Sequence, residues 1–309
     1  MSEHAVGLAS DMAIMSLLAL SAWLVLRVGR ISFGQQAFFG LGAYASGLAS
    51  ALAQWPLAMA LLAGALVGAV TSLALALPTM RLSGLHYAVA TLAFGEMVRL
   101  VLQAWTFQHT TADGLVGPAG LDGFRDIRWL LENDVSPRAY LTLVVAALAL
   151  ALLAVRWLER HRLGLALRSI GHDDVLAAAQ GLPVLRLRLL AATLAGALAG
   201  LGGGLYAHRA TYIEPALFDP MLGVHAVSYA LIGGLGTALG PLLGVAFDLG
   251  LLEATNVFAG WRMVVFGGVV ALFLRWRPRG LLGEALVDRI GRALRPPPAR
   301  AATRSRVIR

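Results

Sequence analysis

The residue types of this chain exclude most forms of covalent catalysis. Cysteine is absent from all 309 residues, which excludes thiol nucleophiles, disulfides and cysteine-ligated metals. Lysine is absent as well, so the chain cannot form the lysine-bearing phosphate loop of ATP-hydrolysing proteins. The histidines have no metal-ligand spacing, and we expect three of them in solvated loops: His161, His172 and His208. We therefore expect no metal and no resident cofactor in this chain.

One serine could be interpreted as a nucleophile. Ser46 lies in the run G-A-Y-A-S-G that starts at Gly42, and this run lacks the G-x-S-x-G form of a nucleophile elbow. An intramembrane serine protease would also need a facing base, for which His225 is an unsupported candidate. The sequence favours a protein that is not an enzyme.

Three ionisable residues lie inside apolar stretches, where charged side chains usually mark functional sites. Glu96 and Arg99 are three residues apart, a spacing that allows a local ion pair on one helix. Asp248 has no partner on its own helix, and Arg99 or His225 could face it across the core. A secondary transporter or channel would use such a carboxylate for a coupling ion, so Asp248 keeps that alternative open.

The composition is that of a membrane protein. Hydrophobic residues make up 58% of the chain, charged residues only 14%, and the mean hydropathy is +0.74. The formal charge of +8 could suggest a nucleic-acid partner. The arginines, however, flank apolar runs of about 20 residues and do not form a basic face with interleaved aromatic residues. We therefore expect a lipid bilayer, and no nucleic acid, around this chain.

Apolar runs predict an all-α, polytopic transmembrane bundle of roughly nine spans, some of them short or broken. Their expected ranges are 6–26, 33–53, 57–77, 84–103, 140–157, 187–206, 220–235, 239–257 and 261–276. Residues 1–290 would form one membrane domain. The basic, proline-rich residues 291–309 would form a disordered tail against anionic lipid headgroups.

Arginine placement predicts the orientation of these spans. No arginine precedes the first span, whereas Arg27 and Arg30 follow it, so the amino terminus is expected outside. Alternation then places the acidic loop 104–139 outside, and residues 207–219 outside as well. The arginine-dense segment 160–188 and the carboxy terminus fall inside, where the positive-inside rule requires them.

Glycine spacing predicts both close helix packing and a helix break. Pairs four residues apart, such as Gly64 with Gly68 and Gly196 with Gly200, let transmembrane backbones approach closely. The run Gly233-Gly234-Leu235-Gly236 is denser, and Pro241 follows it, so a helix break is expected there. A second interruption is the polar opening R-I-S-F-G-Q-Q that starts at Arg30.

The polar segment from Arg160 to Arg188 cannot cross a bilayer, because each charge would cost a few kcal/mol at the midplane. It should stand in water as one or two short helices that could dock a soluble partner, and a plain solvated loop is the alternative. Asp173 and Asp174 could cap a helix start, and Gly181 could end that helix.

Four stretches resemble one family, the permeases of branched-chain amino acid ABC importers. The stretches are Arg30–Tyr44, Leu85–Val101, Ile232–Gly244 and the polar segment. The second stretch points to an M-type and not an H-type permease subunit. The polar segment resembles the cytoplasmic coupling region of that family, which implies contact with an ATPase through these residues: Gly164, Leu167, Arg168, Ile170, Asp173, Asp174, Ala177, Ala179 and Gly181. Gly171, His172 and Ala178 depart from the family pattern.

The resemblance implies a type II-like ABC importer permease in the bacterial inner membrane. Its partners would be an H-type permease subunit, two ATPase subunits that bind ATP-Mg, and a periplasmic substrate-binding protein. It also implies that the chain begins one span later than many relatives. Broken segments lie near the centre of such permeases, so the resemblance makes these residues candidates for the translocation path: Ser32, Phe33, Gly34, Gln35, Glu96, Arg99, Gly233, Gly234, Gly236 and Asp248.

The implied substrates are branched-chain amino acids. Related systems carry other amino acids, amides or urea, and these remain alternatives. ATP dependence of uptake would separate any of them from a secondary transporter or channel, which would respond to ion gradients.

Overall fold

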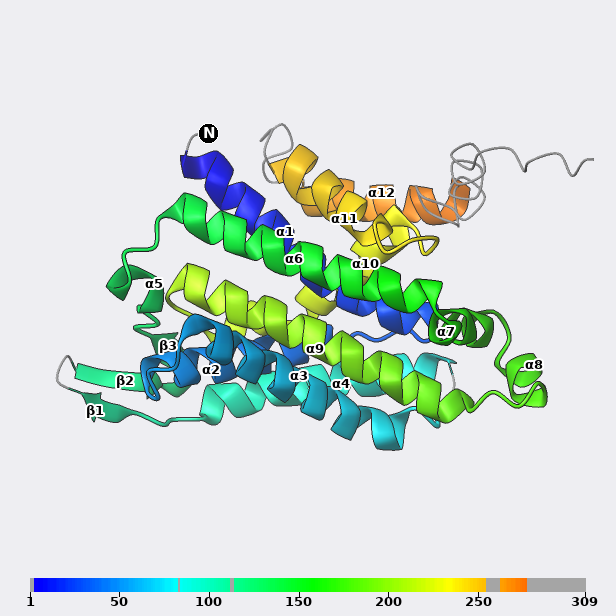
Figure 1. Cartoon of the computed structure of the whole chain (residues 1–309), viewed down its shortest axis with the longest axis horizontal. Helices are drawn as coiled ribbons and strands as arrows, with labels where there is room; N and C mark the ends of the chain where they lie inside the picture. The colour runs from blue at the N-terminus through cyan, green and yellow to red at the C-terminus, as the bar shows by residue number, and fades with distance from the viewer. Residues whose placement is uncertain (1–2, 83, 112–113, 254–261, 277–309) are drawn as a thin grey trace, which may run out of the picture.

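The computed structural model describes residues 3–82, 84–111, 114–253 and 262–276. Within these ranges the chain is helical apart from its connections and one small sheet (Figure 1). The predicted tail, residues 291–309, lies outside the described residues.

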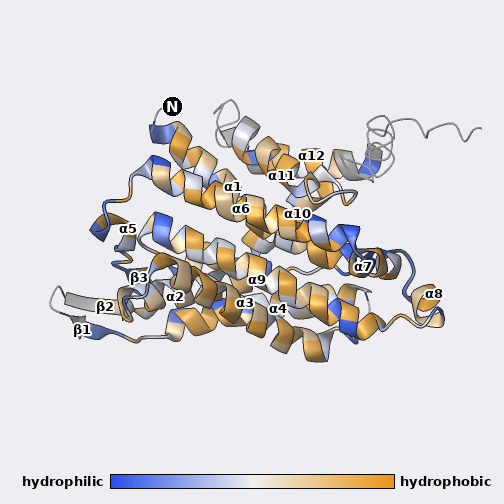
Figure 2. Ribbon diagram, in the orientation of Figure 1, coloured by the Kyte–Doolittle hydropathy of each residue, from blue (hydrophilic) through white to orange (hydrophobic). Residues whose placement is uncertain are grey.

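Five described helices are long and apolar enough to cross a membrane, judged by length and composition. They are α1 (Glu3–Arg27), α3 (Leu57–Thr79), α4 (Gly84–Ala104), α6 (Pro137–Arg160) and α9 (Val184–Ala210). At 1.5 Å per residue, helices of this length match a hydrocarbon core of about 30 Å. Apolar residues cover their middle parts, and polar residues gather toward their ends (Figure 2). These helices confirm the prediction of a polytopic helical membrane protein.

Shorter helices complete the bundle. They are α2 (Gln35–Ala51), α10 (Pro220–Gly233), α11 (Gly240–Val245), a π-helical segment that continues α11 (Ala246–Glu253), and α12 (Arg262–Trp276). Each of the nine predicted ranges therefore contains helix, although residues 254–257 and 261 of those ranges lie outside the described residues. The type II-like arrangement of the spans stays a prediction.

The loop predicted at 104–139 contains structure that the all-helical expectation did not include. Three short antiparallel strands, β1 (His109–Thr111), β2 (Gly114–Pro118) and β3 (Phe124–Arg125), form a sheet in the order β1-β2-β3. The single turn α5 (Trp129–Glu132) follows. This region lies at one end of the long helices, and α7 (Arg162–His172) and α8 (Asp174–Ala179) lie at the other (Figure 1).

Helix α1 is the most enclosed of the long helices. Of its most apolar 18-residue window, 72% is buried inside the chain, against 17% for α6. It packs against α9, α6, α10 and α11. A helix that is apolar on all sides must be surrounded by other elements, and α1 meets that condition.

Glycines bring α2, α3 and α9 into direct backbone contact, as their spacing predicts. A Cβ atom on Gly200 would lie 2.3 Å from the carbonyl oxygen of Gly64, and one on Gly42 would lie 2.3 Å from the Gly200 Cα. Gly68 and Gly196 face each other in the same way, each 2.3 Å from the other's carbonyl oxygen. We call these five residues the glycine seam. No larger residue fits there without moving a backbone.

The expectation that His208 lies in a solvated loop is wrong. Helix α9 continues to Ala210, four residues into the predicted loop 207–219, and His208 is fully buried within it. Its Nε2 lies 3.1 Å from the hydroxyl oxygen of Ser46 on α2, whereas its Nδ1 has no hydrogen-bond partner among the described residues. His161 and His172, at the two ends of α7, are exposed as expected.

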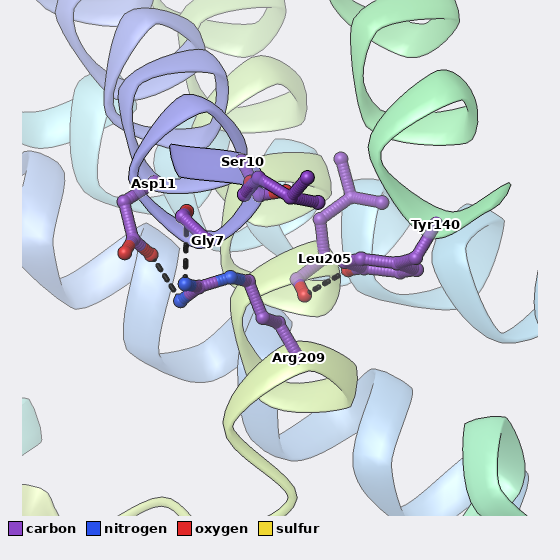
Figure 3. A network of polar contacts seen from close by, with 7 residues as sticks. Gly7, Ser10, Asp11, Tyr140, Leu205 and Arg209 are labelled. Carbon is purple, nitrogen blue, oxygen red and sulfur yellow. Dashed lines mark hydrogen bonds and ion pairs between the residues drawn. The ribbon is translucent and has the colours of Figure 1, made fainter. Parts of the chain in front are cut away.

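Polar contacts tie α9 to α1 and α6 near the amino terminus (Figure 3). Arg209 forms an ion pair with Asp11 and donates a hydrogen bond to the carbonyl oxygen of Gly7 at 2.9 Å. The hydroxyl of Tyr140 on α6 donates to the carbonyl oxygen of Leu205.

Candidate functional site

The polar segment folds as two short helices, as predicted, with α7 ending where α8 begins. Asp173 caps α8, because its Oδ1 accepts hydrogen bonds from the backbone N–H groups of Val175 at 3.0 Å and Leu176 at 2.9 Å. Gly181 follows the end of α8 with a φ of +83°, in the left-handed region that favours glycine. Both cap assignments from the sequence are confirmed for Asp173 and Gly181.

Asp174 does not cap the helix but joins α8 to α9. Its Oδ2 accepts a hydrogen bond of 2.7 Å from Arg188, whose side chain is only 9% exposed. This bond lowers the pKa of Asp174 below its ordinary value. Arg30 lies near this pair, and its pKa is lowered, first by burial and then by the positive charge of Arg188. Its guanidinium lies 5.9 Å from the ring centre of Tyr87. The segment is thus connected electrostatically to the loop between α1 and α2.

Backbone contact reinforces that connection. A Cβ atom on Gly171, near the end of α7, would lie 2.2 Å from the carbonyl oxygen of Arg27. Gly29, with a φ of +73°, faces Gly171 from the turn after α1. Arg27 itself forms an ion pair with Glu159 at 3.6 Å and donates to the carbonyl oxygen of Leu235. The turn 27–30 therefore contacts α7, the end of α6 and the loop between α10 and α11.

The nine residues of the predicted coupling set separate into two groups. Leu167, Ile170 and Ala177 are buried, and they pack with Val28, Leu187 and Ala191. The other six are at least partly accessible: Gly164, Arg168, Asp173, Asp174, Ala179 and Gly181. Between them the segment exposes large apolar side chains that the sequence reasoning did not select, namely Leu165 (66%), Val175 (76%) and Leu176 (56%).

The polar opening before α2 is held inside the bundle. The N–H of Phe33 donates to the hydroxyl of Thr91 on α4 at 3.1 Å, and that of Gly34 donates to Ser32 at 3.4 Å. A Cβ atom on Gly34 would lie 2.9 Å from the Thr91 carbonyl oxygen, so glycine is needed for this approach. Gln35 accepts a hydrogen bond of 3.2 Å from Ser21 of α1. Ser32, Phe33, Gly34 and Gln35 are thus brought together where α1, α2 and α4 meet.

The sequence reasoning missed Gln36, the next residue. Its side chain is fully buried, and neither of its amide atoms has a hydrogen-bond partner among the described residues. Gln36 faces Gly95 of α4 and Gly223 of α10, whereas Gln35 faces α1. The sequence did hold a signal for Gln36: two adjacent polar residues, Gln35 and Gln36, begin an otherwise apolar span, and only the first was selected.

The remaining path candidates occupy other places. Glu96 and Arg99 form the predicted local pair, with Arg99 Nε donating to Glu96 Oε2 at 2.8 Å. Gly233 packs against Gly240, and Gly234 has a φ of +99°, which confirms the predicted helix break before α11. Gly236 follows in the connecting turn.

Asp248 lies on the π-helical segment, where it is only 2% exposed. The hydroxyl of Tyr229 on α10 donates a hydrogen bond of 2.7 Å to its Oδ2. Arg99, one partner considered from the sequence, is instead bound to Glu96. The protease pairing of Ser46 also finds no support, because Ser46 contacts His208 inside the packed α2–α9 interface. Within the described residues no group of three or more acidic or histidine side chains could hold a metal ion.

Enclosed helices, glycine packing and a short helical segment at one end are the features of a polytopic helical membrane protein, and comparison with known proteins assigns its class. Residues 4–274 match the model of a family described as the permease component of branched-chain amino acid transport systems. The chain belongs to this family. It is a transport permease subunit of the ABC importer class and not an enzyme.

Individual relatives refine the assignment. LivM, a permease protein of the high-affinity branched-chain amino acid transport system of Salmonella typhimurium, is 28% identical over 306 residues, covering 88% of this chain and 69% of LivM. LivH of the same organism is 26% identical over 185 residues, covering 55% and 59%. The nucleoside ABC transporter permease NupC of Lactococcus lactis is 26% identical over 275 residues, covering 80% and 84%. The longer match to LivM agrees with the expected M-type. No solved structure matches the chain.

Proposed function

We propose that this chain is the M-type subunit of an ATP-driven importer of branched-chain amino acids in the bacterial inner membrane. The description of its family and the printed role of LivM support this substrate class. NupC, whose name says that it serves nucleosides, makes nucleosides the second substrate class to test.

The subunit would work in a complex. Its partners would be an H-type permease beside it, two ATPases that bind ATP-Mg, and a periplasmic substrate-binding protein. A need for lateral partners or lipid is supported by exposed apolar side chains on the long helices, including Leu62 and Leu66 on α3 and Leu150 and Leu153 on α6. A need for separate ATPases follows from the lack of lysine.

The amino terminus and the small sheet would lie on the periplasmic side, and α7, α8 and the carboxy terminus on the cytoplasmic side. The support is the positive-inside rule together with the position of the sheet and of α7 and α8 at opposite ends of the bundle (Figure 1). Because the chain has no native cysteine, single cysteines report this orientation cleanly. We expect Leu121→Cys, and not Gln180→Cys, to react with a membrane-impermeant maleimide in intact cells with a permeabilised outer membrane. The reverse pattern would invert the orientation.

One observation carries the coupling role: α8 exposes Val175 and Leu176 while its opposite side is packed onto the bundle through Ala177. An exposed apolar turn on a short, capped helix is suited to insertion into a groove of a partner. In this proposal the exposed residues contact the ATPase. Leu167, Ile170 and Ala177 fix the segment to the rest of the chain.

Movement of the segment would reach the interior through two contacts. The first is the backbone approach of Gly171 to the turn at Arg27 and Gly29. The second is the Asp174–Arg188 pair, which lies near Arg30. Both contacts act on the loop that leads directly into α2. Closure of the ATPases would therefore shift the amino-terminal end of α2 relative to α4.

The test uses the complete complex in proteoliposomes with the binding protein, ATP and radiolabelled leucine. Val175→Asp should lower leucine uptake and leucine-stimulated ATP hydrolysis together by at least tenfold, because a charge replaces the apolar contact. The same charge at the polar, exposed Gln180 (Gln180→Asp) serves as the control and should change both rates less than twofold. Normal coupling in Val175→Asp would show that α8 is not the ATPase contact.

The same preparation discriminates the alternatives. Uptake by the wild-type complex should require ATP and should not respond to an imposed ion gradient, whereas a secondary transporter would give the opposite result. Excess unlabelled isoleucine should abolish leucine uptake, while excess uridine should leave it unchanged. Uptake of radiolabelled uridine without uptake of leucine would assign the chain to nucleoside transport.

A further inference from the structure

A buried, unpartnered amide lies where three helices meet. Gln36 has no solvent exposure, and its Nε2 and Oε1 both lack hydrogen-bond partners among the described residues. Leaving such a group unpaired destabilises a fold, because its hydrogen bonds to water are lost without replacement. Leucine would occupy a similar volume without that cost. A residue that lowers stability at such a position needs a functional explanation.

Two glycines leave room for this amide. A Cβ atom on Gly95 of α4 would lie 2.2 Å from Gln36 Nε2, and one on Gly223 of α10 would lie 2.1 Å from Gln36 Oε1. Any side chain at either position would therefore displace the amide. We call Gln36, Gly95 and Gly223 the amide pocket.

The amide pocket lies at mid-height of the bundle and at a helix start. Gly95 is at the middle of α4, which spans Gly84–Ala104. Gly223 also faces the carbonyl oxygen of Phe33, so the amide is level with the amino-terminal end of α2. The first N–H groups of a helix have no carbonyl one turn earlier to bond, and the helix dipole places positive potential there.

We propose that the Gln36 amide and the amino-terminal end of α2 together hold the carboxylate of an amino-acid substrate midway across the membrane. This rests on the proposed function, because it assigns a residue to substrate recognition by the same permease. The amide NH₂ and the N–H groups of Gln35 and Gln36 at the start of α2 are donors, whereas the N–H of Ala37 already donates to the Gly34 carbonyl oxygen at 3.1 Å. A carboxylate is the strong acceptor that such donors select.

The pocket opens when α4 and α10 move away from α2. In the structure the glycines close directly over the amide, so a substrate enters only after this movement. The loop 28–34 contacts Gly171 of the polar segment at Gly29 and leads directly into α2, the helix that carries Gln36. The residue proposed to bind the substrate and the loop that contacts the polar segment therefore lie in the same short stretch of chain, residues 28–36.

The first test compares Gln36→Leu with Gln35→Leu in the reconstituted complex with binding protein, ATP and radiolabelled leucine. Gln36→Leu should lower leucine uptake at least tenfold. It should also raise the Tm of the purified complex, since an unpaired polar group is removed. Gln35→Leu removes the neighbouring amide, which has its partner on α1, and should lower uptake less than threefold.

The outcomes are separable. Wild-type uptake by Gln36→Leu overturns the carboxylate site, and so does a lowered Tm, which would mean that the amide stabilises the fold. If the wild-type complex itself shows no ATP-dependent leucine uptake, the proposed function fails and not the site alone. Gln36→Asn, which keeps a shorter amide, should recover part of the uptake that Gln36→Leu loses.

The second test asks whether the pocket opens. Gln36→Cys introduces the only thiol of this chain, so labelling by N-ethylmaleimide can be followed on its own band. Labelling should be at least fivefold faster during ATP turnover with loaded binding protein than in the resting complex. Ser46→Cys, fully buried between α2 and α9, should stay unlabelled in both states. Equal labelling of Gln36→Cys in both states would overturn the opening movement.

Discussion

The glycine seam and the amide pocket both place glycine against a neighbouring helix, but they contact different atoms. In the seam, Gly64 and Gly200 meet backbone atoms, which cannot rotate away. In the pocket, Gly95 meets the far end of the Gln36 side chain, which can. The first arrangement fixes α2, α3 and α9 as one unit. The second lets Gly95 of α4 part from the Gln36 side chain, although Gly34 and Gly223 nearby also approach backbone oxygens, those of Thr91 and Phe33.

This difference indicates which helix contacts can separate during transport at a small cost in free energy. If two helices separate where glycine backbones meet, their packing contacts are lost. Lipid offers no hydrophobic gain that would replace the lost free energy. Separation at the amide pocket instead gives an unpaired amide the chance to form hydrogen bonds. We therefore predict that α2, α3 and α9 move as one unit, and that transport separates Gly95 of α4 from the Gln36 amide.

The largest expected effect comes from breaking the seam. Gly200→Leu should destabilise the subunit by about 3 kcal/mol or more, because its Cβ alone would lie 2.3 Å from the Gly64 carbonyl oxygen. The measurement is the Tm of the purified complex, together with the amount of subunit in the membrane. Gly268→Leu on α12 is the matched control, since a Cβ there meets nothing within 4 Å. Equal Tm values for the two variants would show that the seam is not the rigid part.

A smaller effect separates the two kinds of glycine contact. Gly68→Ala should destabilise by about 1–3 kcal/mol, because the new methyl group would lie 2.3 Å from the Gly196 carbonyl oxygen. Gly95→Ala introduces the same methyl group against a movable amide and should cost less than half as much. It should nevertheless lower leucine uptake, since it displaces Gln36. A Gly95→Ala variant as unstable as Gly68→Ala would remove the distinction between seam and pocket.

Much of the fold could be predicted from the sequence because its signals are local. Apolar length located the spans, glycine spacing located the seam, and dense glycines before Pro241 located the helix break. The cap at Asp173 and the end at Gly181 were predictable for the same reason, since they depend on neighbours two or three residues away.

What the sequence did not reveal depends on contacts between distant segments. His208 looked like a loop residue until Ser46, on another helix, was found beside it. Gln36 is distinguished from Gln35 only by the direction in which each side chain points, which adjacent residues of a helix do not share. The resemblance implied a partner contact at Ala177, yet the structure buries it and exposes Val175.

The smallest expected effect concerns the attachment of α8, through which the mobile part would be driven. A nitroxide on Gln180→Cys reports the mobility of this helix, because the chain has no other cysteine. Asp173→Ala removes two cap hydrogen bonds and should loosen α8 by about 1 kcal/mol. Asp174→Asn removes only the ion pair with Arg188. The Asp174 side chain is 47% exposed and its charge is screened by solvent, so α8 should loosen less than in Asp173→Ala.

The pH dependence of that attachment has a defined sign. The folded-state pKa of Asp174 is lowered, so its stabilisation is present above the unfolded pKa of about 3.9 and is lost only as the pH falls through the lower folded pKa. The spectra should therefore not change between pH 5 and 8. The measurement is made with His172→Gln in the background, because histidines as a class titrate in that range. Mobility that rises between pH 8 and 5 would contradict the lowered pKa of Asp174. A larger effect for Asp174→Asn than for Asp173→Ala would show that the ion pair and not the helix cap attaches α8. The movement of the coupling segment would then be governed by the charges of Asp174, Arg188 and Arg30.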